Sequence, residues 1–97
     1  MPSEARTGLS YHHLGRRSEI DIIGKILTEA KKGIRKTSLM YKCNLNNKQL
    51  EIYLSFLLKI GLLDSRLDER NNRLFFRTAS KGSKFLSAYS KLKALML

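Results

Sequence analysis

The sequence predicts an α+β domain that is mostly helical, and three observations along the chain indicate it. Apolar residues recur at helical spacing in three successive segments between residues 18 and 60. Two alternating segments, 62–69 and 73–79, then flank a polar tip, a pattern typical of a β-hairpin. A further amphipathic segment follows at 80–97. This order predicts a helix-turn-helix with a β-hairpin, or wing, behind it and a C-terminal helix after the wing.

Length and composition indicate one small domain. The chain has 97 residues, of which 42% are hydrophobic and 28% charged, enough for a single core. No apolar run approaches the ~20 residues that cross a bilayer, and the start has no signal-like apolar stretch, so we expect a cytoplasmic protein. Residues 1–17 are predicted to form a flexible basic arm, and residues 18–97 the folded domain.

The first helix has clear end signals. Ser18 is predicted to cap it, and Asp21 places a carboxylate near its positive end. Lys31-Lys32 are expected in its last turn, and Gly33 is expected to end it. Ile34 is expected to pair as a third strand at the base of the wing. The expected buried stripe is Ile20, Ile23, Leu27 and Ala30.

The second and third helices are predicted around a turn at residues 44–46. Thr37 is the expected cap of the second helix, and Cys43, the only cysteine, is expected to be a small buried apolar residue. The third helix is predicted over 47–60 and stops at Gly61. At about 100° per residue, its buried side is Leu50, Tyr53, Leu54, Leu57 and Leu58. Its outward side is Lys48, Glu51, Ile52, Ser55 and Lys59, with Gln49 and Phe56 at the margin.

The charge of the chain indicates a polyanionic partner. The formal net charge is +11, and no acid lies between Glu29 and Glu51 or after Arg70. Such blocks form basic faces that attract polyanions, and a long helix beside a basic hairpin suits a major groove flanked by phosphates. We therefore predict double-stranded DNA as the partner. An anionic membrane has no amphipathic anchor to support it, and nothing in the sequence implies a small-molecule ligand.

The third helix is the predicted reader of DNA bases. Asn47 and Gln49 can each pair bidentately with adenine, and Lys48 can donate to guanine. Cap and turn roles also explain Asn46 and Asn47, and for Asn46 the cap is the preferred interpretation. The residues expected at the DNA backbone further along the helix are Ser55 and Lys59.

Ile52 leaves two interpretations open, because an isoleucine on an outward helix face needs a partner. It either contacts thymine methyl groups or packs under Phe56 against the arm or a neighbour. The second interpretation belongs to an alternative function, a protein-interaction module that never touches DNA. A weaker alternative is RNA or single-strand binding, with Tyr11, Tyr53 and Phe76 as stacking platforms.

The wing and the start of the second helix are the other predicted contacts. The wing arginines are placed to meet phosphates or a narrow minor groove, although Asp64, Asp68 and Glu69 weaken their field. An Asn-Asn tip also tolerates positive φ, which turn geometry alone explains. The predicted wing contacts are Arg66, Arg70, Asn72 and Arg73, and those of the second helix are Lys36, Thr37 and Lys42.

The sequence predicts neither an enzyme nor a metal protein. His12 and His13 are adjacent, with no nearby cysteine or acid, and lack the spacing of a metal site. Paired carboxylates, a glycine-rich phosphate loop and a nucleophile–base set are all missing from the sequence. We therefore expect no catalytic residue, cofactor or metal.

The C-terminal helix is predicted to form a homodimer. Ser80 is its expected cap, and four of its apolar residues step by 4, 3 and 4, which gives a seam of two heptads. Two more residues widen this seam, so that part of it can face the domain's own core and part a second copy. The predicted interface is Phe85, Leu86, Tyr89, Leu92, Leu95 and Met96.

A likeness to a known family rests on five segments: 20–27, Gly33 to Thr37, 39–54, 59–63 and 78–86. With these segments, the stretch from Arg17 to Leu97 resembles the small archaeal winged-helix DNA-binding proteins, which include chromatin-type dimers and N-terminal domains of transcriptional regulators. The resemblance implies a homodimeric transcriptional regulator or nucleoid-associated protein that contacts duplex DNA through the third helix and the wing. Chromatin-type relatives extend the final helix further, whereas here it ends about 16 residues after Lys81. Two heptads are marginal for a coiled coil, which leaves the first helix or the arm to assist the dimer.

Overall fold

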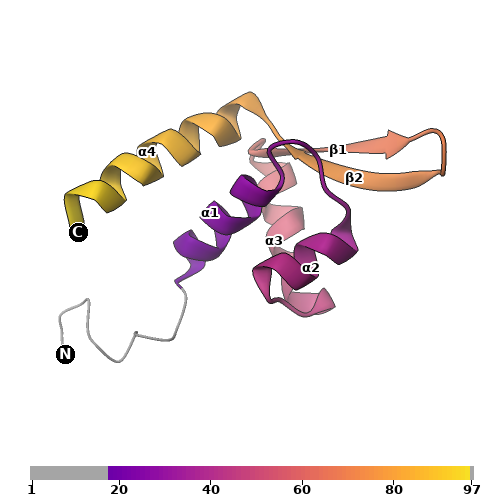
Figure 1. Ribbon diagram of the computed structural model, residues 1–97, viewed down its shortest axis with the longest axis horizontal. Coiled ribbons are helices and arrows are strands. Elements are labelled where there is room, and N and C mark those ends of the chain that lie inside the picture. Colours follow the sequence, from indigo (N-terminus) through magenta and orange to yellow (C-terminus); the bar gives the residue numbers. More distant parts are fainter. Residues whose placement is uncertain (1–17, 97) are drawn as a thin grey trace.

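The computed structural model describes residues 18–96, and the predicted arm at 1–17 lies outside the described residues. Three helices form the body, and the hairpin and the last helix leave it on opposite sides (Figure 1). The elements are α1 (Glu19–Glu29), α2 (Lys36–Cys43), α3 (Asn47–Lys59), β1 (Leu63–Asp68), β2 (Arg73–Thr78) and α4 (Ser80–Met96). This order confirms the predicted fold, a helix-turn-helix followed by a wing and a C-terminal helix.

The core lies between the three helices and the base of the hairpin. Leu39, Leu50 and Leu57 are fully buried, and Cys43 is buried with them as expected. The expected stripe of the first helix was wrong at one end, because Ile20 is 47% exposed. The buried residues of α1 begin only at Gly24, so the first turn stands outside the core. The fully buried residues of α1 and its end are Ile26, Leu27 and Ala30.

The first helix starts where predicted and ends earlier. The backbone N–H of Asp21 donates to the Ser18 hydroxyl at 3.1 Å, which confirms the cap. The prediction that Gly33 ends this helix was wrong, since α1 stops at Glu29 and Lys31-Lys32 follow it. The reason is tertiary: the Ala30 carbonyl accepts a hydrogen bond from the N–H of Thr78 in β2 at 3.0 Å.

Gly33 and Ile34 form the link between the first two helices. Gly33 has φ +93°, and a Cβ there would lie 3.1 Å from the ring of Phe75, so the position requires glycine. Ile34 pairs with Phe76 through two backbone hydrogen bonds of 2.9 and 2.7 Å, which confirms the expected third strand as a single bridge. Arg35 is therefore held extended, and α2 begins directly after it.

Two predicted helix caps were wrong. Arg35, not Thr37, precedes α2, and it makes no side-chain capping bond. Thr37 lies inside the first turn because the Ile34 bridge starts the helix earlier. Likewise Ser80 is the first residue of α4, since the Ala79 carbonyl already accepts from the N–H of Ser83 at 3.0 Å.

The turn and the third helix follow the sequence closely. Asn44 adopts a left-handed conformation, φ 54° and ψ 51°, at the end of α2. Asn46 caps α3: its side chain accepts from the N–H of Gln49 at 2.8 Å, and its own N–H donates to the Gln49 side chain at 3.0 Å. This reciprocal capping box confirms the cap interpretation of Asn46. Gly61, at φ +81°, follows the helix end.

The hairpin is a two-stranded antiparallel sheet with Leu63 opposite Thr78 at its base and Asp68 opposite Arg73 near its tip. Phe76 is buried and Phe75 is half-buried, so only one residue of this pair packs fully into the core. Asn72 has φ 55°, the positive value expected of the tip.

Candidate nucleic-acid interface

The outward side of α3 is exposed as predicted. Lys48, Ser55 and Lys59 are open to solvent, and Ile52 is 64% exposed. The helix is anchored on its other side by leucines in the core, and the capping box fixes its first turn. A rigid helix with one polar outer side is the element that a groove can accept.

The start of α2 joins this side of α3 to the wing. The Lys36 ammonium pairs with the Glu51 carboxylate on α3. The adjacent Arg35 pairs with Asp68 near the end of β1, with 3.5 Å between nitrogen and oxygen. Because Arg35 and Lys36 are consecutive, the outer side of α3 and the end of β1 flank the same short segment. The predicted reader helix and the predicted wing are therefore each tied to the start of α2 by one ion pair.

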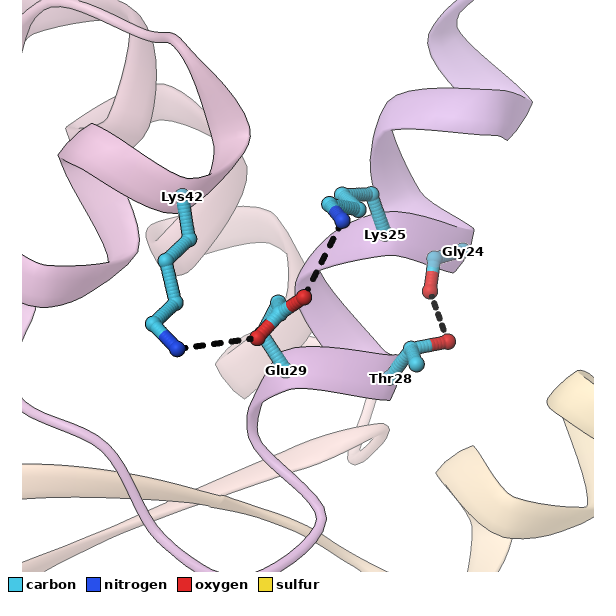
Figure 2. Close-up of polar contacts among 5 residues, drawn as sticks. All are labelled: Gly24, Lys25, Thr28, Glu29 and Lys42. Carbon is cyan, nitrogen blue, oxygen red and sulfur yellow. Dashed lines mark hydrogen bonds and ion pairs between the residues drawn. The ribbon is translucent and has the colours of Figure 1, made fainter.

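Two of the cations that were predicted to bind phosphates form ion pairs within the chain. Lys36 has Glu51 as its partner, and the Lys42 ammonium lies 3.7 Å from the Glu29 carboxylate. Figure 2 shows Glu29 between Lys42 and Lys25, whose ammonium is 3.0 Å from it. The hydrogen bond from Lys25 and the positive charges of both lysines lower the pKa of Glu29 below its ordinary value of 4.5, against the effect of burial. These lysines reach a phosphate only by sharing or leaving their acids.

Neither Gln49 nor Thr37 stands in the arrangement that the sequence suggested. The Gln49 side-chain oxygen accepts from the backbone of Asn46, so a bidentate contact with adenine requires the capping box to open. Asn47 is the first residue of α3 and is exposed. Thr37 is exposed in the first turn of α2, where it faces solvent rather than capping the helix.

The wing presents its cations to solvent. Arg66, Arg70 and Arg73 are all exposed, and the backbone N–H of Arg70 donates to the Asp68 carboxylate at 3.1 Å. Asp68 thus serves both the tip and Arg35, which removes part of the acidic field that the sequence placed on the wing. Sequence reasoning missed the pairing of Arg35 with Asp68 because these two residues lie far apart along the chain.

A hollow beside this surface has a different character. It has a volume of about 450 Å³ and lies between α1 and α3. Ile22 and Ile23 line it from α1, and Ile52 and Phe56 line it from α3. Phe56 is 48% exposed, so the margin of the reader helix is partly apolar. This hollow supports the interpretation of Ile52 as a packing residue as much as a base-contacting one.

The C-terminal helix uses half of its predicted seam within the chain. Phe85 and Leu86 pack against the core, and Phe85 stacks on Tyr89 with 6.0 Å between ring centres. The Tyr89 hydroxyl donates to the Asp21 carboxylate, which ties α4 to α1. The Lys93 ammonium lies 5.4 Å from the centre of the Tyr89 ring. The outer half of the seam stays exposed: Leu92 by 54%, Leu95 by 84% and Met96 by 65%.

The Tyr89–Asp21 contact shifts the pKa of both side chains. The hydrogen bonds from Tyr89 and Ser18 lower the pKa of Asp21 below its ordinary value of 3.8, with burial opposing them. Burial and the Asp21 carboxylate raise the pKa of Tyr89 to about 12. Both shifts favour the hydrogen-bonded pair at neutral pH, and the contact fixes the direction in which α4 leaves the body.

Between residues 18 and 96, no group of three or more metal-ligating side chains comes together, and none of the helices is long and apolar enough to span a membrane.

Comparisons with known proteins agree with this architecture. The sequence pattern of the winged helix-turn-helix family matches residues 16–97. The chain belongs to that family. The crystal structure of Sso10a-2, a DNA-binding protein from Sulfolobus solfataricus, superposes with a TM-score of 0.73 at 21% identity, covering 82% of each chain. The winged helix-turn-helix chain thus has the fold of Sso10a-2, and the family match confirms the resemblance drawn from the sequence. No curated protein matches the chain.

Proposed function

We propose that this winged helix-turn-helix protein binds double-stranded DNA, with the outer side of α3 in the major groove and the wing over the adjacent backbone. The observation that supports the proposal is that α3 and the wing are both tied to the start of α2. Arg35 and Lys36 tie the wing and α3 to one segment, and the exposed cations Lys48 and Arg70 belong to these two elements. Sso10a-2, which has this fold, is a DNA-binding protein.

The net charge of +11 gives the interaction its main driving force. Each phosphate neutralised releases a counterion, so the binding constant falls steeply with salt. In this proposal the wing arginines and Lys59 hold phosphates, and Lys48 and Asn47 lie closest to base edges. Residues 18–97 form the binding domain, and the cations of residues 1–17 add to the positive field.

The proposal includes a homodimer formed through the exposed end of α4. Leu92, Leu95 and Met96 are large apolar side chains that are more than half exposed. Burying them against the same residues of a second copy would place two wings on one duplex or on two. A dimer of this kind suits either a transcriptional regulator or a nucleoid-associated protein in the cytoplasm.

Fluorescence anisotropy with a labelled duplex tests the DNA proposal. We expect Lys48→Ala combined with Arg70→Ala to weaken binding at fixed salt and to flatten the log–log salt dependence by roughly 0.9, because Arg70 holds a phosphate whereas Lys48 lies at a base edge. The matched control is Lys84→Ala combined with Lys91→Ala, which removes the same charge from α4. Wild-type affinity and slope in the first variant would remove both residues from the interface.

A second candidate function is a protein-interaction module, favoured by the apolar hollow that Ile52 and Phe56 line. The same titration separates the two functions. Absence of wild-type binding to any duplex at about 50 mM salt, where counterion release is most favourable, would support the module and reject DNA binding.

A further inference from the structure

The hollow between α1 and α3 leaves large apolar side chains of two folded helices uncovered. Its volume is about 450 Å³. Ile22, Ile23 and Tyr53 in its lining are half-buried, whereas Ile52 is 64% exposed and Phe56 is 48% exposed. Apolar side chains that gather at one place on a small domain mark a surface that another segment covers. The hollow is therefore a candidate docking surface.

The charges around the hollow indicate what kind of segment fits it. Of the described residues that line the hollow, Glu19 is the only charged one. The lining therefore offers no cation to a phosphate group, and its one charge attracts a basic segment. Gln49, which also lines the hollow, already accepts a hydrogen bond from the backbone of Asn46. The occupant that fits is an apolar segment with positive charge, and a DNA backbone does not fit.

The hollow lies where the described part of the chain begins. Glu19, Ile22 and Ile23 line it from the first turns of α1. Ser18 caps that helix, and residues 1–17 precede it. An extended chain advances at most about 3.6 Å per residue, so Leu14, four positions before Ser18, lies within about 14 Å of it. A segment tethered this closely meets the hollow at a high effective concentration.

The preceding segment has the composition that the hollow requires. Residues 9–17 contain three large apolar side chains, those of Leu9, Tyr11 and Leu14, and no acid. The last two residues of this segment are arginines. Gly15 directly follows Leu14, and a glycine can adopt the positive φ that a reversal of the chain direction needs.

We propose that residues 9–14 of the N-terminal arm fold back along α1 and dock in the hollow, with Tyr11 and Leu14 covering Ile52 and Phe56. This inference goes beyond DNA binding and does not depend on it. It assigns Ile52 to packing, and it leaves the polar side chains of α3 to the duplex. The docked arm also occupies the surface that a partner protein would otherwise use.

Nuclear Overhauser contacts in the full chain test the docking directly. With methyl groups labelled, we expect cross-peaks from Leu14 to the Ile52 methyl groups and to the Phe56 ring. A mixture of labelled and unlabelled protein shows whether these contacts lie within one chain. We expect all of them within one chain, because the tether between Leu14 and Ser18 is short.

Trypsin cleavage measures how firmly the arm is held. Cleavage of a docked segment tracks the population that opens. We expect Leu14→Ser to speed cleavage after Arg16 about tenfold, since a buried leucine stabilises the docked state by roughly this factor. The bond after Arg6 precedes the docked segment and should be cut at the wild-type rate. The matched control is Leu74→Ser, the same change at a 56% exposed leucine of the wing, and it should leave both rates unchanged.

A double-mutant cycle identifies the partner of Leu14. Ile52→Ser should speed cleavage after Arg16 as much as Leu14→Ser does. If the two side chains touch, the double variant is cut no faster than either single variant, because the first change already removes the contact.

Three results would overturn the docking. The first is the absence of cross-peaks from the arm to the hollow, with equal cleavage of the wild type and Leu14→Ser. The second is rate increases that multiply in the double variant, which would place Leu14 and Ile52 in separate contacts. The third is cross-peaks between labelled and unlabelled chains, which would assign the hollow to the arm of a second copy. None of these measurements includes DNA, so each decides the docking whether or not the chain binds a duplex.

Discussion

Replacing Glu51 with glutamine is predicted to strengthen DNA binding. Glu51 is the only acid on the outer side of α3, and its carboxylate holds the Lys36 ammonium beside the proposed groove contact. The pair is largely open, with side chains 34% and 56% exposed, so its loss costs at most about 1 kcal/mol of stability. Glu51→Gln removes a negative charge facing the phosphates and frees Lys36 to meet one of them.

The size of the gain follows from charge and distance. A unit charge about 4 Å from another contributes about 1 kcal/mol even in water, which corresponds to roughly fivefold in affinity. One additional phosphate contact makes the log–log salt dependence steeper by about 0.9. Both quantities come from the same anisotropy titration, repeated between about 50 and 200 mM salt.

The matched control is Glu19→Gln, the same change at an exposed acid that forms no ion pair with residues 18–96. We expect its salt slope to stay at the wild-type value, because no lysine is released. An unchanged slope in Glu51→Gln would show that Lys36 meets no phosphate. Weaker binding in that variant would show that the carboxylate itself contacts the DNA, and either result would refute the reasoning.

Three further predictions concern stability and assembly. Gly82→Ala places a Cβ 2.2 Å from the Leu62 carbonyl oxygen and 2.8 Å from the Thr78 side chain. Thermal melting should therefore show a loss of about 3 kcal/mol or more in the free energy of unfolding. An unchanged melting temperature would contradict the packing of α4 on the hairpin base. Because the pKa of Asp21 is lowered in the folded state, its stabilisation is complete above its ordinary pKa of 3.8 and is lost as the pH falls through the lower value. Tyr89→Phe should therefore lose less stability in acid than the wild type does, and equal acid unfolding curves would contradict the contact. Leu92→Asp with Leu95→Asp should give a monomer in light scattering, and a wild type already monomeric at high concentration would reject the dimer.

Local chemistry made much of the fold predictable. The capping box of Asn46 and Gln49, the positive φ at Gly61 and the Asn-Asn tip each depend on residues within a few positions, so the sequence contains the whole signal. The buried side of α3 was predicted from its period for the same reason. The interpretation of Asn46 as a helix cap was confirmed.

Tertiary contacts account for what the sequence did not reveal. The Ile34–Phe76 bridge was expected, but its effect on the start of α2 was not: the helix begins at Lys36, and Thr37 is displaced from the cap. The ion pair of Lys36 with Glu51 spans 15 positions, and the Tyr89–Asp21 bond spans 68. Such contacts depend on how the elements pack, which periodicity cannot report. An exception is Lys25–Glu29, whose spacing of four on one helix was visible in the sequence.

Mapping of backbone amide shifts by nuclear magnetic resonance during titration with a short duplex tests the central claim most directly. If α3 and the wing form one DNA-binding surface, the shifts concentrate on the outer side of residues 47–59, on the start of α2 and on residues 66–74. The α1 side of the hollow, formed by Ile22 and Ile23, and the exposed end of α4 then stay unchanged. Shifts confined to that hollow or to α4, or shifts on α3 without the wing, would contradict a shared surface.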